Sequence, residues 1–390
     1  MTKKNKKETK LEWNDIERYA VNTQRLVNEF THLVSIDAVS FEERKMADYL
    51  IEQLTILGFE VSEDRAGEYY NSNTGNIYAI KKGTVAGNSI LFSSHMDTVE
   101  PGKNKKAIIH EDGTITSDGT SILGADDVSG IAAILEAVRM IEENKLKHRD
   151  IEILFTIGEE AYLRGSEVFD YSVIQAKEAY TLDLCGEIGT VALQAPTVMS
   201  FTLEIFGKAS HAGFQPEEGI NSIEIASKII SQIKQGKVDS DTTFNIGTIE
   251  GGTATNIVSD YCKIKGEIRS YYHEKVLAQL AILEKISKQI TGEYAASYKL
   301  ENVIVCIAYQ MEETSDAVQK FMNACNELNY EISLTKTFGG SDNNNLVCHG
   351  INGLVIACGM EQVHTCKEYT NIEALIKSTM LLLKLVEREV

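Results

Sequence analysis

A histidine and an acid stand two residues apart in the stretch SSHMDTVE, which directly follows the short apolar run from Ile90 to Phe92. Residues i and i+2 of a β-strand point to the same face, so His95 and Asp97 would leave the strand side by side. Such a pair makes a metal ligand, because one ring nitrogen can bind an ion while the other donates to an oxygen. Taken alone, the motif is more simply a solvated polar loop, so its meaning depends on the residues at the ends of the other predicted strands.

Acids or a histidine also stand at the ends of the other predicted elements: Asp126 before a helix, Glu159 and Glu160 after Ile157, Asp183 after Leu182, and His364 ahead of the last helix. In open α/β sheets, ligands bind outside the carboxyl ends of the strands, so we expect these side chains to meet. Each has an ordinary explanation by itself, such as a helix cap, an exposed loop or a surface histidine. Together, two histidines and three carboxylates suit two divalent metals about 3.5–4 Å apart, with one bridging acid and one histidine and one acid per ion. The spare glutamate beside a ligand is where a general base would lie.

Helical and strand periodicities alternate along the first and last parts of the chain. The predicted helices cover residues 13–36, 42–57, 128–141 and 315–328, and the predicted strands cover residues 76–80, 90–94, 151–157 and 179–184. A strand, a glycine-rich loop, a strand and a helix complete the chain. This alternation indicates an α/β fold whose mainly parallel sheet has helices on both faces.

The pattern changes near Pro196, where strand-like segments outnumber helices. Strands are predicted at 199–206, 243–249, 260–269 and 299–306, and helices at 221–235 and 274–290. An α+β domain inserted into the α/β domain is the simplest account of this change. We expect the insert to cover 197–310, and the two parts of the catalytic domain to cover 1–196 and 311–390.

Composition restricts the classes of partner. The chain has 390 residues, 43% of them hydrophobic, which is enough for two domains with full cores. A net charge of −19 argues against nucleic acid and anionic membranes, because phosphates would be repelled. No apolar stretch of about 18 residues could span a membrane, and no apolar segment after the basic N-terminus suggests a secretory signal. Seven cysteines with scattered spacing fit a reducing compartment, so we expect a cytoplasmic protein.

The order and wording of the motifs resemble the zinc-dependent aminoacylase/carboxypeptidase superfamily of exopeptidases, and most closely its peptidase T, or tripeptidase, branch. The matching segments lie between about residues 90 and 365 and read SHMDTV, GADDVSG, TIGEE, KASHAG, GGTATN and GGSDNN, with Asp183 and His364. One departure is Val128, where peptidase T sequences usually carry a lysine. Because that position is not a ligand, the departure bears on substrate placement rather than on metal binding.

The resemblance implies two zinc ions per chain. The implied ligands form two sets that share one acid: His95, Asp126 and Asp183 for one ion, and His364, Glu160 and Asp126 for the other. Asp97 would orient the first histidine, and Glu159 would be the general base that converts a bridging water into the attacking hydroxide. A cis peptide bond is expected between Asp126 and Asp127.

Residues of the insert are implied to complete the site. His211 in KASHAG would stabilise the tetrahedral oxyanion, often in the neighbouring subunit, so we expect a homodimer formed through an inserted lid or dimerisation domain. Asn256 and Arg269 would clamp the substrate carboxylate, for which a planar guanidinium is well suited. Gly340 and Ser341, in a glycine-rich loop, would bind the substrate terminus.

The favoured function is a metal-dependent aminopeptidase that releases the N-terminal residue from short peptides, with tripeptides as the expected substrates. A dipeptidase, a carboxypeptidase or an N-acyl amino acid deacylase of the same superfamily stays open. So do a degenerate member that only binds metal or peptide and a structural oligomerisation protein. A structural zinc on the C-terminal cysteines is disfavoured, because their spacing matches no finger or ribbon pattern.

Overall fold

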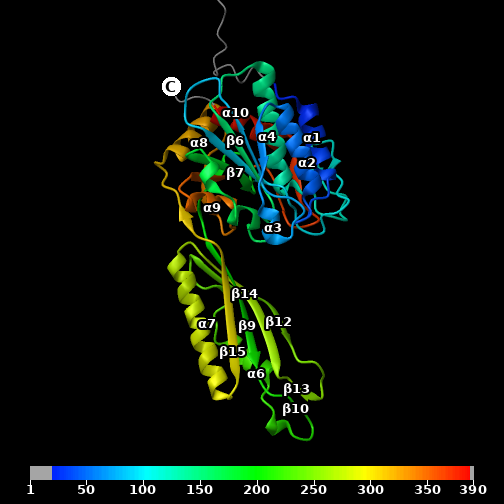
Figure 1. Ribbon diagram of the computed structural model, residues 1–390, viewed down its shortest axis with the longest axis vertical. Coiled ribbons are helices and arrows are strands. Elements are labelled where there is room, and N and C mark those ends of the chain that lie inside the picture. The colour runs from blue at the N-terminus through cyan, green and yellow to red at the C-terminus, as the bar shows by residue number, and fades with distance from the viewer. Residues whose placement is uncertain (1–19, 387–390) are drawn as a thin grey trace, which may run out of the picture. The chain divides into compact units, whose positions relative to one another are not determined.

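The computed structural model of the protein describes residues 20–386, which form two compact units (Figure 1). The first unit contains the described residues up to Val191, together with Glu313–Leu334 and the residues from Gly350 onward. The second unit contains Ala192–Glu312 and Thr335–His349. The start of the predicted helix over 13–36 lies outside the described residues. We propose that the first unit is the catalytic domain and that the second unit is the inserted domain.

A sheet with the strand order β1-β2-β6-β3-β7-β18 forms the centre of the first unit. Its strands are β1 (Glu60–Glu63), β2 (Ile77–Lys81), β6 (Ile151–Thr156), β3 (Ile90–His95), β7 (Glu178–Leu184) and β18 (Asn352–Ala357). The last four run parallel, whereas β1 and β2 pair in antiparallel fashion at one edge. Strands β3 and β6 are buried along their whole length, in keeping with the apolar runs Ile90–Phe92 in β3 and Ile153–Phe155 in β6. The predicted mainly parallel α/β sheet is therefore confirmed.

Five longer helices belong to this unit: α1 (Thr23–Ser35), α2 (Arg44–Ile56), α4 (Ala125–Asn144), α8 (Asp316–Glu327) and α10 (Ile372–Val386). Helix α4 packs on β3 and β7 and also contacts α1 and α10. Gly130 permits this close packing, because a Cβ atom there would lie 2.8 Å from Leu182 Cβ and 2.9 Å from Ser94 Oγ. The first turn of α4 consequently lies beside both strands. No helix of the described part of the chain is long and apolar enough to cross a membrane.

Several shorter elements were not predicted from the sequence. They are α3 (Ala66–Tyr70), β4 (Ile108–Ile109), β5 (Thr114–Thr116), α5 (Arg164–Glu167), β8 (Thr190–Ala195), β16 (Tyr309–Gln310), α9 (Asp342–Cys348) and β19 (Tyr369–Asn371). The strand predicted between helix 315–328 and the glycine-rich loop is present as β17 (Ser333–Lys336). Strand β19 pairs with β5, and β5 pairs with β4, to form a small separate sheet. Most of these elements are too short to show a periodicity of their own.

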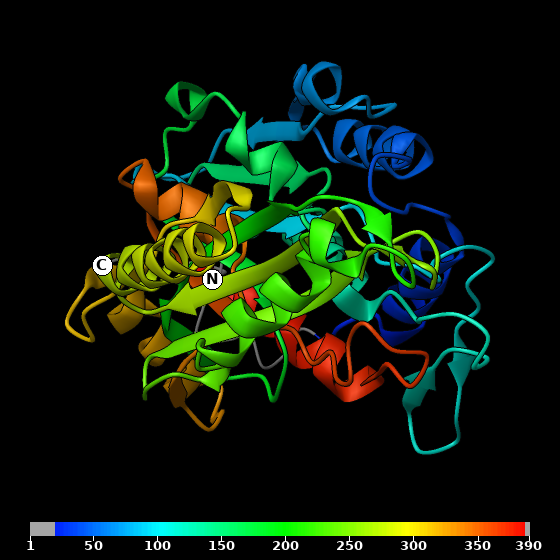
Figure 2. The same ribbon diagram turned by 90° about the horizontal axis from the view of Figure 1, so that it is seen from below.

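The second unit contains an antiparallel sheet with the strand order β11-β12-β14-β9-β15. Its elements are β9 (Thr197–Phe206), β10 (Ser210–His211), α6 (Ser222–Ser231), β11 (Gly236–Lys237), β12 (Thr242–Gly251), β13 (Ile257–Val258), β14 (Tyr261–Ser270), α7 (His273–Glu293) and β15 (Ser297–Cys306). Helices α6 and α7 pack on each other and on this sheet (Figures 1 and 2). Phe201, Leu203, Phe244 and Ile264 are buried between the two layers. This arrangement is the α+β fold predicted for the insert.

Candidate metal centre

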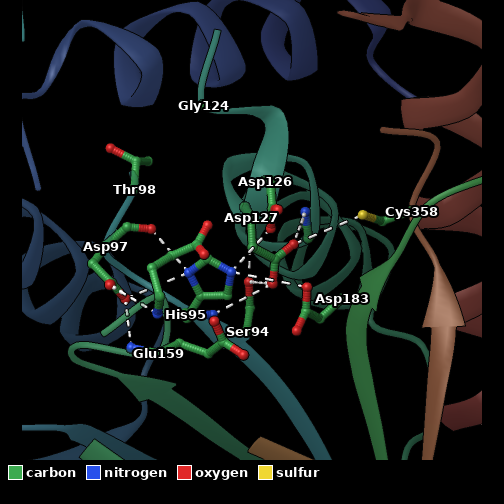
Figure 3. Close-up of polar contacts among 12 residues, drawn as sticks. Ser94, His95, Asp97, Thr98, Gly124, Asp126, Asp127, Glu159, Asp183 and Cys358 are labelled. Atoms are coloured by element: carbon green, nitrogen blue, oxygen red, sulfur yellow. Dashed lines mark hydrogen bonds and ion pairs between the residues drawn. The ribbon is translucent and has the colours of Figure 1, made fainter. Parts of the chain in front are cut away.

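Three of the predicted ligands meet at the carboxyl ends of β3 and β7 and in the first turn of α4 (Figure 3). His95 is the last residue of β3, and Asp183 is the second-to-last residue of β7. His95 Nε2 lies 3.0 Å from Asp126 Oδ1 and 3.9 Å from Asp183 Oδ1. The parallel pairing of β3 with β7 and the packing of α4 on both strands bring these side chains together.

A second histidine approaches the other oxygen of the same acid. His364 lies in the loop between β18 and β19, and its Nε2 is 3.2 Å from Asp126 Oδ2. The same nitrogen is 2.9 Å from Glu160 Oε1, which follows β6. The two carboxylate oxygens of Asp126 therefore face two different imidazoles, as an acid shared between two ions would.

The hydrogen bonds of His95 direct its Nε2 atom at Asp126. His95 Nδ1 lies 2.9 Å from the carbonyl oxygen of Asp97, which can only accept, so Nδ1 carries a proton. In a neutral ring, the lone pair of Nε2 would then point at a carboxylate oxygen, so either a proton or a bound cation must lie between the two atoms. Although burial disfavours the charged ring, hydrogen bonds with Asp126 and Asp97 raise the pKa of His95 well above its usual value.

The charges of the other candidate ligands favour a bound cation. Hydrogen bonds with Asp126 and Glu160 raise the pKa of His364 to about 10. Burial, and after it the neighbouring charge of Asp126, raises the pKa of Asp183 well above its usual value. The groups around Asp126 contain two imidazoles and four carboxyl groups, those of Asp126, Asp183, Glu159 and Glu160, and a divalent cation would supply positive charge to balance them.

Two groups of potential donor atoms share Asp126, and within each group the atoms lie within 4.8 Å of one another: His95, Asp126 and Asp183, and Asp126, Glu160 and His364. A third group consists of His95, Glu159 and Glu160. Mixed imidazole and carboxylate ligands suit zinc, and they also suit cobalt and manganese. None of the potential metal groups found among residues 20–386 contains a cysteine.

Asp97 holds the backbone that carries the predicted base. Its carboxylate accepts the N–H group of Glu159 at 3.0 Å (Figure 3). It also accepts the N–H group of Glu160 at 3.2 Å and the hydroxyl of Ser40 at 2.6 Å. His95 Nδ1 lies 2.9 Å from the carbonyl oxygen of Asp97 but 3.5 Å from its carboxylate. Asp97 therefore contacts His95 mainly through its main chain, and its side chain fixes the turn after β6.

Other buried polar groups around the cluster were not singled out in the sequence. Glu43 accepts the N–H of Gly158 at 3.0 Å, and burial together with the charge of Asp97 raises the pKa of Glu43 to about 7. Gly158 has a φ of 55°, and a Cβ atom there would lie 2.8 Å from the ring of Phe41, so the turn requires glycine. Burial also raises the pKa of Glu368 to about 7.

Asp127 lies behind the predicted bridging acid. The peptide bond between Asp126 and Asp127 is cis, as expected from the sequence. The Asp127 carboxylate accepts a hydrogen bond from Ser94 Oγ and lies 3.7 Å from Cys358 Sγ (Figure 3). Asp127 is fully buried, and burial raises its pKa well above the usual value, so its environment differs from that of Asp126.

Two of the predicted insert residues lie together in the second unit. His211 in β10 pairs with Ile257 in β13, and the N–H of Ala212 donates to the carbonyl oxygen of Asn256 at 3.0 Å. The His211 ring is exposed and stacks on Phe214, with 4.3 Å between the ring centroids. The loop with His211 and the loop with Asn256 are therefore one structural feature.

Arg269 and the glycine-rich loop form a second group in this unit. Arg269 Nη1 donates to the carbonyl oxygen of Phe338 at 2.9 Å, just ahead of Gly340 and Ser341. Ser341 is the N-cap of α9, so the predicted loop leads directly into a helix. The Nε and Nη2 atoms of Arg269 bind the carboxylate of Glu267 at 2.8 and 3.0 Å. The bidentate edge expected to bind substrate is therefore directed at a neighbouring side chain.

These two groups lie at opposite ends of the second unit. Strand β14 begins at Tyr261, close to the Asn256 loop, and Arg269 is its second-to-last residue. Eight residues of extended strand span about 27 Å. Within one chain, the structure therefore does not bring His211 and Asn256 together with Arg269.

Known peptidases share this sequence pattern and fold. The sequence profile of the Peptidase dimerisation domain of the M20 type matches residues 195–295, and that of Peptidase family M28 matches residues 76–228. A crystal structure of aminopeptidase PepT from Bacillus cereus is 38% identical in sequence, with a TM-score of 0.87 over 94% of this chain and 98% of that chain. A tripeptidase from Staphylococcus aureus is 33% identical, with a TM-score of 0.91 over the same shares. Peptidase T of Listeria monocytogenes is 25% identical over 413 residues, covering 93% of this chain and 97% of the relative.

Proposed function

The chain belongs to the peptidase T branch of the M20-type metallopeptidases, and we propose that it is an aminopeptidase that releases the N-terminal residue from tripeptides. The proposal is supported above all by Asp126, whose two oxygens face His95 and His364 separately. The relatives described as an aminopeptidase and as a tripeptidase support the reaction and the substrate length.

We assign two divalent ions, most simply zinc, to the two groups of donors that share Asp126. His95 and Asp183 would complete the first group, and Glu160 and His364 the second. Ions held there would act as Lewis acids, polarising the peptide carbonyl and making a water molecule acidic enough to attack at neutral pH. The mixture of imidazole nitrogen and carboxylate oxygen is the donor set that this chemistry uses in proteins.

Glu159 is the proposed general base. It would take a proton from the attacking water and then pass that proton to the departing amine. Its backbone N–H is held by Asp97, and the neighbouring Gly158 N–H is held by Glu43, so the turn that carries the base is fixed on both sides. The role of Asp97 in this account is to position Glu159 and His95.

His211 is the proposed partner of the oxyanion, and we propose that it acts in the site of a second copy of the chain. The distance along β14 separates His211 and Asn256 from Arg269, so one copy alone would not supply both groups to one substrate. The match of residues 195–295 to a peptidase dimerisation domain supports a homodimer. In this account Arg269, Gly340 and Ser341 bind substrate from one copy, and Asn256 does so from the other.

Mixing two inactive variants tests this sharing of sites. His211→Ala and Glu159→Gln would each abolish turnover alone, whereas a mixed dimer would have one complete site. After unfolding and refolding together at equal concentration, we expect about a quarter of the wild-type activity, because half of the dimers are mixed and each has one of two sites. No recovery in dimers shown to have mixed would contradict the proposal.

The function itself is tested by cleavage of Ala-Ala-Ala and of its N-acetylated form by zinc-loaded protein. We expect release of the N-terminal alanine from the free peptide only, and loss of turnover in Glu159→Gln. Glu68→Gln, which changes an exposed glutamate, is the matched control and should keep wild-type activity. Cleavage of the acetylated peptide instead would make the protein a deacylase or a carboxypeptidase.

We also propose that the enzyme acts in the cytoplasm on short peptides. All seven cysteines are free thiols, and four of them are buried, as is usual for proteins kept in a reducing compartment.

A further inference from the structure

A buried carboxylate with no predicted role lies behind the ligand cluster. Glu368 is fully buried and follows His364 by four residues, in the loop ahead of β19. One of its oxygens accepts the Gly124 N–H at 2.7 Å, and the other accepts the Asp126 N–H at 2.9 Å. Glu368 therefore binds the backbone on both sides of Ala125, at the start of α4.

These two N–H groups would otherwise lack a partner. The first N–H groups of a helix have no acceptor within it, and a side chain at the N-cap usually supplies one. The N-cap of α4 is Gly124, which has no side chain, and Asp126 has non-helical backbone angles. The missing acceptor is supplied by Glu368, which lies 242 positions beyond Asp126 in the sequence.

The same contact joins two segments that each carry a candidate ligand. The first turn of α4 carries Asp126, and the loop before β19 carries both Glu368 and His364. His364 Nε2 lies 3.2 Å from Asp126 Oδ2, so this ligand pair depends on how the two segments are held together. We propose that Glu368 is a positioning residue that sets the geometry of Asp126 relative to His364 and thereby the affinity for the ion between them. This inference rests on the proposed metallopeptidase function.

Helix capping alone does not account for a carboxylate at this position. Burying a charged group is energetically unfavourable, whereas a neutral cap such as serine or asparagine would avoid that cost. Lys105 is the nearby buried cation, but its Nζ donates to the carbonyl oxygens of Ile36 and Gly102. No ion pair within the part of the chain that the structure describes compensates Glu368. The two equivalent oxygens of the Glu368 carboxylate instead match two N–H groups, those of Gly124 and Asp126, which it binds at the same time.

The test measures zinc affinity in Glu368→Gln. This change keeps the size of the side chain but replaces one acceptor oxygen with an NH₂ group, which faces an N–H donor. Glu373→Gln is the matched control, because Glu373 lies five residues later, is exposed and forms its ion pair with Lys377 in the next turn of the helix. Affinity is measured on metal-stripped protein by competition with a chromophoric chelator, and the Tm of the metal-free protein reports on the fold.

We expect Glu368→Gln to bind one of its two ions about 10–100-fold more weakly, as is typical for outer-sphere partners of metal ligands. kcat should fall while KM stays within about twofold of wild type, and the control should change neither quantity. If Glu368→Gln does not fold, Glu368→Asp keeps the charge, withdraws it by one methylene and should show the same loss of affinity.

Wild-type affinity for both ions, together with a lower Tm of the metal-free variant, would overturn the inference and leave Glu368 as a structural cap. The proposed function has a separate outcome. Wild-type protein that binds two ions tightly but cleaves no peptide would overturn the peptidase assignment, whereas the effect of Glu368 on metal affinity would still be measured.

Discussion

Asp97 offers the sharpest test of how the proposed base is held. Its carboxylate accepts three hydrogen bonds, from the backbone of Glu159 and Glu160 and from the hydroxyl of Ser40. Asp97→Asn keeps one acceptor oxygen and places an NH₂ group where the other oxygen was. One of the two backbone N–H groups should then lose its partner, and the turn that carries Glu159 should shift or loosen.

The magnitude is set by the bonds that are lost. A hydrogen bond to a charged group contributes about 1.5–3 kcal/mol, and about 1.4 kcal/mol corresponds to a factor of ten in rate. We therefore expect Asp97→Asn to lower kcat about 10–100-fold. Asp97→Ala removes both backbone acceptors and should lower kcat about 10²–10⁴-fold. Ser40→Ala leaves both N–H groups paired, so its effect should stay below about tenfold.

The assay is steady-state cleavage of a free tripeptide at saturating zinc, with the Tm of each variant measured alongside. The loss of kcat should be smallest in Ser40→Ala, larger in Asp97→Asn and largest in Asp97→Ala. KM should change little, because Asp97 positions the base rather than the substrate. A loss smaller than about threefold in Asp97→Asn, or a larger loss in Ser40→Ala than in Asp97→Asn, would refute the reasoning.

Three further outcomes are expected. Zinc at a hundred times its Kd should stabilise the metal-free protein by about 2.7 kcal/mol, seen as a rise in Tm, and Asp126→Asn should show a smaller rise. Burial lowers the pKa of Lys105 from 10.5 to about 8, so between these pH values the unfolded chain binds more protons and stability should increase with pH. Urea unfolding of Lys105→Met should lack that increase. Gly130→Ala places a Cβ atom 2.8 Å from Leu182 Cβ and should destabilise the protein by about 1–3 kcal/mol, whereas Gly292→Ala, with open space around it, should not. Equal Tm values for these two variants would contradict the packing described for α4.

The sequence was most informative where periodicity was long. The predicted helix over 128–141 lies within α4, and the predicted strand over 90–94 lies within β3, because each buries a continuous apolar face or run. Strand β1 was missed because three of its four residues are polar and most are exposed, and it is held in place by its pairing with β2. Pairing between distant segments leaves little trace in a short polar segment.

The candidate ligands could be predicted because parallel strands align their carboxyl ends, so residues far apart in sequence meet at one edge. The residues that hold these ligands and the proposed base in place could not be predicted from the sequence. Ser40 reaches Asp97 across 57 positions and Glu368 reaches Asp126 across 242, and neither contact has a local pattern. The pairing of Arg269 with Glu267, in contrast, does have a local pattern in the sequence, because residues i and i+2 of a strand share a face.

The shared role of Asp126 is the central claim, and anomalous X-ray diffraction at the zinc edge tests it most directly. Crystals of the zinc-loaded protein should show two peaks about 3.5–4 Å apart, with one carboxylate oxygen of Asp126 bound to each. His95 and Asp183 should be bound to one peak, and His364 and Glu160 to the other. A single peak, or two peaks of which only one contacts Asp126, would contradict the account.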